Sequence, residues 1–75
     1  MTRDELVNNI KSALQREEAL SEDTLFGDIK EWDSLSIISV ISLFDELFST
    51  KLAYREITEL RTVRELIDKV KDRLV

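Results

Sequence analysis

The 75-residue chain contains no cysteine, no histidine and no proline, and its only glycine is Gly27. The lack of cysteine and histidine excludes thiol catalysis, imidazole acid–base chemistry, iron–sulfur clusters and ordinary zinc sites. Glycine-rich phosphate loops and the Asn-Gly or Asp-Gly turns of tight β-hairpins are absent too. No apolar run could span a bilayer, and residues 1–5 lack a signal-peptide core. We therefore expect a cytoplasmic protein with no membrane association.

The composition is that of a folded helical protein with an uneven charge. Hydrophobic residues make up 43% and charged residues 36% of the chain, and its length leaves room for a single domain, residues 1–75. The net charge is −5, but residues 17–50 alone carry nine acidic and one basic side chain. This local charge of −8 opposes nucleic-acid binding and favours a basic partner.

Two capping boxes and a long apolar run predict the three longer helices. Thr2-x-x-Glu5 precedes an amphipathic stripe and predicts a helix over 3–17. The most apolar segment predicts a second helix over 34–48, and Thr62-x-x-Glu65 precedes a last helix over 63–74.

The remaining segments predict a short helix and a long loop. A hydrophobic residue at every third position from Tyr54 to Leu60 suits a helix of one or two turns. Residues 19–33 mix turn-forming residues with apolar anchors such as Phe26 and Trp32, which indicates a loop pinned to the core. The prediction is an all-α fold, a small four-helix bundle with three longer helices and one short one.

Few groups in this sequence could support catalysis or bind a metal. The adjacent carboxylates Glu17–Glu18 and Asp45–Glu46 lie near predicted helix ends, where solvated surface charge is the ordinary interpretation. So small a chain also offers little concave volume for a substrate. We expect no catalytic residue, no metal site and no enzymatic activity of its own.

Ser34 is the residue that stands out. It lies between the acidic loop and the apolar helix, so Asp33 or Ser34 could simply be the N-cap of that helix. With no histidine or lysine base nearby, Ser34 is not a self-activated nucleophile. It could still accept a group from another enzyme, since a helix N-terminus tolerates a phosphate through its free N–H groups and dipole.

The tripeptide Asp33-Ser34-Leu35 resembles the 4′-phosphopantetheine attachment motif of acyl carrier proteins. The resemblance extends over nearly the whole chain: its length, its acidity, the long anchored loop, and the motif at the start of the second helix. It implies that a phosphopantetheinyl transferase attaches 4′-phosphopantetheine from coenzyme A to Ser34. The arm would carry acyl thioesters to acyl-loading, condensing or acyltransferase enzymes of fatty-acid, polyketide or related biosynthesis, and the protein would be a monomer.

The sequence departs from the family at two places. Many members have glycine where Glu31 stands, and Trp-Asp-Ser-Leu resembles stand-alone carriers of specialised pathways more than the general fatty-acid carrier. The second helix also carries few acids, which predicts partner binding that is less salt-sensitive than that of a strongly acidic carrier. The residues that we expect to contact partners are Trp32, Ser36, Ile37, Ile41, Asp45 and Glu46.

Two other functions fit the sequence. An aminoacyl or peptidyl carrier protein would use the same attachment serine. A small helical interaction domain without a prosthetic group would instead use the apolar second helix to bind a partner helix. Ser34 discriminates between these classes, because only a carrier requires its hydroxyl.

Overall fold

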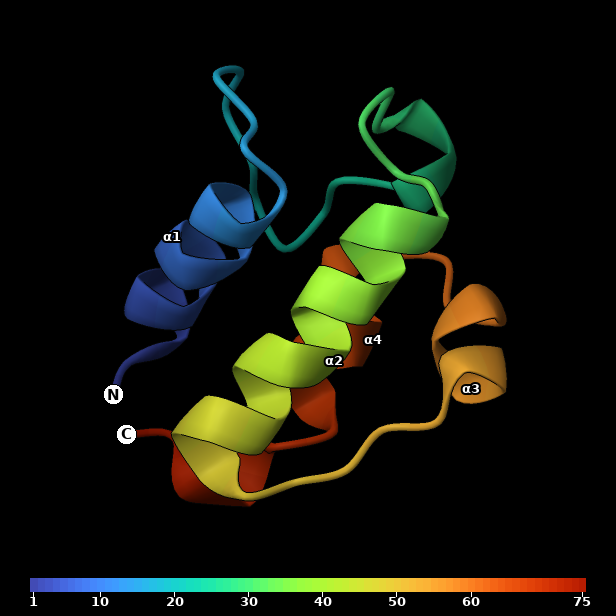
Figure 1. Cartoon of the computed structure of the whole chain (residues 1–75). Helices are drawn as coiled ribbons and strands as arrows, with labels where there is room; N and C mark the ends of the chain where they lie inside the picture. The colour runs from blue at the N-terminus through green and yellow to red at the C-terminus, as the bar shows by residue number, and fades with distance from the viewer.

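The structure is a computed structural model that describes residues 1–75 and contains helices but no strands. Its elements are α1 (Arg3–Ala13), the 3-10 turn η1 (Phe26–Asp28), α2 (Ser34–Phe48), α3 (Tyr54–Thr58), α4 (Val63–Asp68) and the 3-10 turn η2 (Lys71–Arg73). The predicted all-α fold with four helices is confirmed, although only α1 and α2 are long (Figure 1). None of the helices has the length and apolar character needed to cross a membrane.

The core is one cluster of 16 buried side chains, all of them apolar. The apolar stripes predicted from spacing supply it: Leu6 and Ile10 of α1, Phe44 of α2 and Ile57 of α3 have no exposed surface. No polar or charged residue belongs to this core, so the charged groups of each helix lie outside it. The core therefore needs no buried polar network to hold α2 in place.

Helix α1 is shorter than the sequence predicts, ending at Ala13 instead of residue 17. Gln15 adopts the left-handed conformation, with φ of 55°. The N–H of Arg16 then donates to the carbonyl of Lys11, and that of Gln15 to the carbonyl of Ser12. This is the Schellman pattern, which glycine usually permits. Because glutamine occupies that position here, the sequence contains no stop signal.

The last helix is also shorter than predicted, because α4 ends at Asp68 and the chain continues through η2. Two long-range contacts hold the segment after it. The Arg73 guanidinium donates to the carbonyl of Phe48, and the N–H of Val75 to the carbonyl of Met1. Val70 is buried as the amphipathic pattern predicts. The segment after α4 is held by these tertiary contacts and not by α-helical hydrogen bonds.

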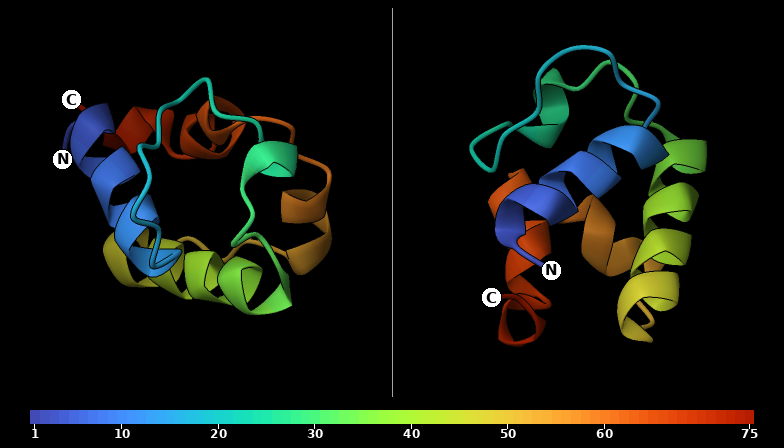
Figure 2. Two further views of the ribbon diagram at one scale, coloured as in Figure 1. Left: turned by 90° about the horizontal axis from the view of Figure 1, so that it is seen from above. Right: turned by 90° about the vertical axis from the view of Figure 1, so that its left-hand side faces the viewer.

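The long loop between α1 and α2 arches over one end of the helices (Figure 2). An isolated antiparallel bridge pairs Leu25 with Thr62, and the N–H of Val63 donates to the carbonyl of Thr24. Phe26 of η1 is buried beneath this contact. The loop is thus fixed to the start of α4 by backbone hydrogen bonds and by an aromatic anchor, as the predicted pinning requires.

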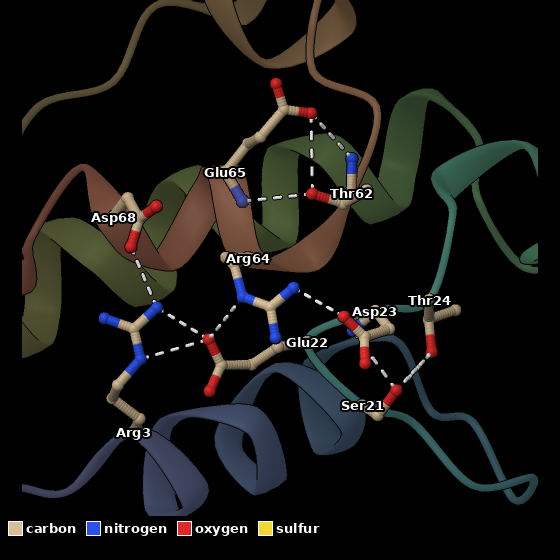
Figure 3. Close-up of polar contacts among 9 residues, drawn as sticks. All are labelled: Arg3, Ser21, Glu22, Asp23, Thr24, Thr62, Arg64, Glu65 and Asp68. Atoms are coloured by element: carbon tan, nitrogen blue, oxygen red, sulfur yellow. Dashed lines mark hydrogen bonds and ion pairs between the residues drawn. The ribbon is translucent and has the colours of Figure 1, made fainter.

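Ion pairs hold the first half of the loop against α1 and α4 (Figure 3). Arg3 lies 2.6 Å from Glu22 and 2.8 Å from Asp68, and Arg64 approaches both Glu22 and Asp23. The hydrogen bond from Arg3 lowers the pKa of Glu22, and the same contacts raise the pKa of Arg3. The network lies around α1 and α4, away from the start of α2.

Candidate functional site

The Asp33-Ser34-Leu35 segment forms the start of α2. Asp33 is the N-cap in extended conformation, and its carboxylate accepts a 2.9 Å hydrogen bond from the N–H of Ser36. That backbone hydrogen bond is the main cause of a lowered Asp33 pKa, and the Leu35 backbone contributes as well. Ser34 is the first helical residue and is exposed. Asp33, not Ser34, therefore caps the helix, and the serine hydroxyl is free for other chemistry.

The residues before the motif are held to the core by aromatic stacking. The Trp32 ring stacks on Phe26, with centroids 4.3 Å apart and planes 18° from parallel. Ile29 between them is buried, and Trp32 itself is half-buried against the core. Trp32 thus helps to anchor the loop, and its partially exposed surface lies two residues from Ser34.

Glu31 connects this segment to the end of α1. Its carboxylate accepts a 2.8 Å hydrogen bond from Arg16, whose side chain is only 7% exposed, and its carbonyl accepts one from the Ser36 hydroxyl. Partial desolvation works to raise the pKa of Glu31, but hydrogen bonds from its own backbone and from Arg16 lower it overall. The position where many carriers have glycine is therefore occupied by a side chain that ties α1 to α2.

Ser34 has one side-chain partner, and it comes from another helix. The hydroxyl of Tyr54, the first residue of α3, donates a 3.0 Å hydrogen bond to Oγ of Ser34. The Tyr54 side chain is 43% exposed. The spacing of apolar residues predicts Tyr54 only as part of a short helix and does not predict this contact. No local pattern links two residues that lie 20 positions apart.

The outer face of α2 differs from the predicted partner surface in one residue. Ile37 is buried in the core and is not available to a partner, so its prediction as a partner contact is wrong. The exposed isoleucine is its neighbour Ile38, at 53% exposure, and Leu35 is 75% exposed. The error arises because an apolar run on a helix does not itself say which side faces the core.

The other predicted partner residues are accessible to different degrees. Ser36 and Ile41 are half-buried, Ile41 packing against the core and Ser36 bound to the loop carbonyl of Glu31. Asp45 and Glu46 are exposed on the second half of α2. The exposed face is therefore apolar near Ser34 and acidic toward the far end of the helix.

An open depression of about 620 Å³ lies beside the motif, between the end of α1 and the first turns of α2. Leu14 and Gln15 line one side, and Leu35 and Ile38 the other. Glu31 and Asp33 also contribute to its wall. Ser34 itself is not among the residues that line this depression, and its Oγ is bonded to Tyr54 of α3. The chain contains no cysteine or histidine.

The chain is similar to acyl carrier proteins. Those of Borreliella burgdorferi strains ZS7 and ATCC 35210 are each 27% identical to it over 78 residues, covering 97% of this chain and 98% of the relative. No family model matches the sequence, and no solved structure matches it. The similarity supports an acyl carrier-type protein, a class of carriers and not of catalysts.

Proposed function

We propose that this protein is a stand-alone acyl carrier that bears 4′-phosphopantetheine on Ser34 and is not itself an enzyme. The observation that carries the proposal is the exposed Ser34 at the first position of α2, within Asp-Ser-Leu. The similarity to acyl carrier proteins over nearly the full chain supports the same function.

The residues around Ser34 suit an attached arm. Ser34 is exposed, and the carboxylate of Asp33 caps the helix that bears it. When attached, the arm supplies a terminal thiol that carries acyl groups as thioesters. This fits a chain that has no thiol of its own. The protein would act by tethering, which raises the effective concentration of the substrate at each partner's active site.

Attachment requires a phosphopantetheinyl transferase, coenzyme A and Mg²⁺. Oγ of Ser34 attacks the phosphorus that carries pantetheine, and a new Ser34 Oγ–P bond forms. The bond from that phosphorus to the bridging oxygen of the diphosphate breaks, and adenosine 3′,5′-bisphosphate leaves. The hydroxyl proton passes to a base of the transferase, since the adjacent carboxylate of Asp33 already accepts the N–H of Ser36 as the helix cap.

We infer that partner enzymes dock on the exposed face of α2 and the loop before it. Leu35 and Ile38 offer apolar contact beside the attachment point, while Asp45 and Glu46 offer charge farther along. Trp32 and the accessible parts of Ser36 and Ile41 complete this surface. Acyl-loading, condensing or acyltransferase enzymes of fatty-acid, polyketide or related biosynthesis would use it, with the carrier acting as a cytoplasmic monomer.

Intact mass spectrometry tests the attachment. The protein is incubated with coenzyme A, Mg²⁺ and a broad-specificity transferase, beside Ser34→Ala and the matched control Ser42→Ala, which removes an exposed hydroxyl from the same helix. We expect the wild type and Ser42→Ala to gain one phosphopantetheine, and Ser34→Ala to gain none. Folded, unmodified protein that gains no mass in any variant would contradict the proposal and favour an interaction domain without a prosthetic group.

A further inference from the structure

Tyr54 holds the attachment hydroxyl from the side of α3. Its phenol is the donor in the 3.0 Å hydrogen bond to Ser34 Oγ, so the serine proton itself remains free to leave. Both residues are exposed, and neither belongs to the core. The hydrogen bond is therefore not needed to satisfy a buried polar group. The Tyr54 hydroxyl could equally donate to another acceptor beside Ser34.

The position of Tyr54 is set by the structure around it. It is the first residue of α3, where the carboxylate of Glu56 accepts a 3.0 Å hydrogen bond from the N–H of Ala53. Ile57, one turn later, is completely buried. The start of this short helix is thus fixed at both the backbone and the core. The phenol is preorganised beside Ser34 and does not have to be recruited from a mobile side chain.

The first turn of α2 offers a phosphate fewer free N–H donors than a helix N-terminus without a capping side chain would. The carboxylate of Asp33 already accepts the N–H of Ser36, and the backbone of Leu35 also contributes to stabilising its charge. A phosphate on Ser34 would lie next to this carboxylate. The sequence-based expectation that free N–H groups receive the phosphate is therefore not met at Ser36. A side-chain donor would add to the groups that can bind the phosphate, and Tyr54 is the side chain that is bonded to Ser34.

We propose that Tyr54 is the phosphate-binding residue of the attached arm, its phenol O–H donating to a non-bridging phosphate oxygen once Ser34 is modified. The inference rests on the proposed carrier function. Modification converts Ser34 Oγ into an ester oxygen, a poorer acceptor, and places anionic oxygens one phosphorus atom away from it. The phenol reaches them with a small rotation and exchanges a neutral hydrogen bond for a charge-assisted one, which is roughly twice as strong. Tyr54 thereby directs how the arm leaves the protein surface.

Tyr54→Phe tests this assignment because it removes only the hydroxyl and retains the ring. The single phosphorus of the modified protein is observed by phosphorus NMR in the wild type, in Tyr54→Phe and in Ser42→Ala, the matched loss of an exposed hydroxyl on α2. We expect the resonance of Tyr54→Phe to be displaced from that of the wild type, and the resonance of Ser42→Ala to coincide with it. Equal unfolding midpoints for the unmodified variants would exclude a general loss of structure.

A second measurement observes the phenol directly. The chain has one tyrosine, so isotope labelling of the ring carbon that bears the hydroxyl gives a single resonance. We expect this resonance to move when Ser34 is modified. Coinciding phosphorus resonances for the wild type and Tyr54→Phe, together with a tyrosine signal unchanged by modification, would overturn the assignment. If the wild type gains no mass in the transferase incubation, the carrier function itself is contradicted. Failure of the Tyr54 assignment is therefore distinguishable from failure of the carrier function.

Discussion

Arg16 and Glu31 join the end of α1 to the segment that leads into α2, with Nη1 of the arginine 2.8 Å from Oε1 of the glutamate. Arg16 lies two residues beyond the cap of α1, and Glu31 two residues before the N-cap Asp33. The same Glu31 also receives the Ser36 hydroxyl at its carbonyl. One residue of the loop thus couples the position of α1 to the first turn of the helix that carries Ser34.

The Arg16–Glu31 pair should contribute to the stability of the loop. Arg16→Met leaves the partly buried Glu31 carboxylate unpaired, so we expect Tm to fall by on the order of 5 °C. Glu31→Gln keeps the side-chain size and should lower Tm less. Thermal unfolding of both single variants and of the double variant gives their coupling. If the fall in Tm of the double variant equals the sum of the falls in the two single variants, the two side chains do not interact.

Ile37 and Ile38 should separate stability from partner binding, because the first is buried and the second is 53% exposed. We expect Ile37→Ala to lower the free energy of unfolding by about 2–4 kcal/mol through lost burial and a cavity. Ile38→Ala should change it by less than about 0.5 kcal/mol, yet reduce kcat/KM for the transferase. Urea unfolding and modification kinetics provide the measurements. An Ile38→Ala protein modified as fast as the wild type would remove Ile38 from the docking surface.

Partner binding should depend only weakly on salt. The first eleven residues of α2 carry no charge, and Leu35 and Ile38 are its exposed large apolar side chains near Ser34. Apolar contacts are screened little by ions, whereas charge steering is lost as ionic strength rises. We expect kcat/KM for the transferase to change little between low and physiological salt, and to become more salt-dependent in Ile38→Glu. A steep loss for the wild type would show that distant charges dominate docking.

The stacked pair of Phe26 and Trp32 provides a test of loop anchoring. Phe26→Leu preserves an apolar side chain but removes the stacking, so we expect a loss of about 1–2 kcal/mol in the free energy of unfolding. Trp32 is the chain's single tryptophan, and its fluorescence emission should shift toward that of an exposed indole. If Phe26→Leu has the Trp32 emission and the free energy of unfolding of the wild type, the loop is held by its backbone hydrogen bonds alone.

Stability should be lost in acid and should be nearly constant around neutral pH. Hydrogen bonds and ion pairs lower the pKa of several carboxyl groups in the folded protein, namely Glu5, Glu22, Glu31, Asp33 and Glu65. Their stabilisation is present above the unfolded pKa values of about 3.9 for Asp and 4.3 for Glu. It is lost as the pH falls through the lower folded values, because the unfolded state then binds more protons.

Measurement of Tm from pH 8 down to pH 3 checks this expectation. The chain has no histidine, so no side chain with an ordinary pKa titrates between about pH 6 and 8. A plateau over that range followed by a fall in acid is the expected profile. A Tm that increased on acidification below pH 4 would contradict the role assigned to these carboxylates.

Local patterns were sufficient to place the helices, but not the ends of α1 and α4. The capping box of Thr2 and Glu5 and that of Thr62 and Glu65 both form, and α2 has the predicted bounds. These features depend on residues within one turn of each other. The end of α1 depends on Gln15 in a left-handed conformation, which few non-glycine residues adopt and which no neighbouring residue announces.

Short-range spacing and residue chemistry are enough to predict the all-α class, the apolar stripes and the Asp-Ser-Leu motif at the start of α2. Packing between distant segments sets that Ile37 faces the core while Ile38 is exposed, and that Tyr54 reaches Ser34. The rotation of α2 is fixed by packing against α1 and α3, and the Tyr54 contact by where α3 docks. Neither is encoded in the spacing of adjacent residues, since both arise from contacts between segments distant along the chain.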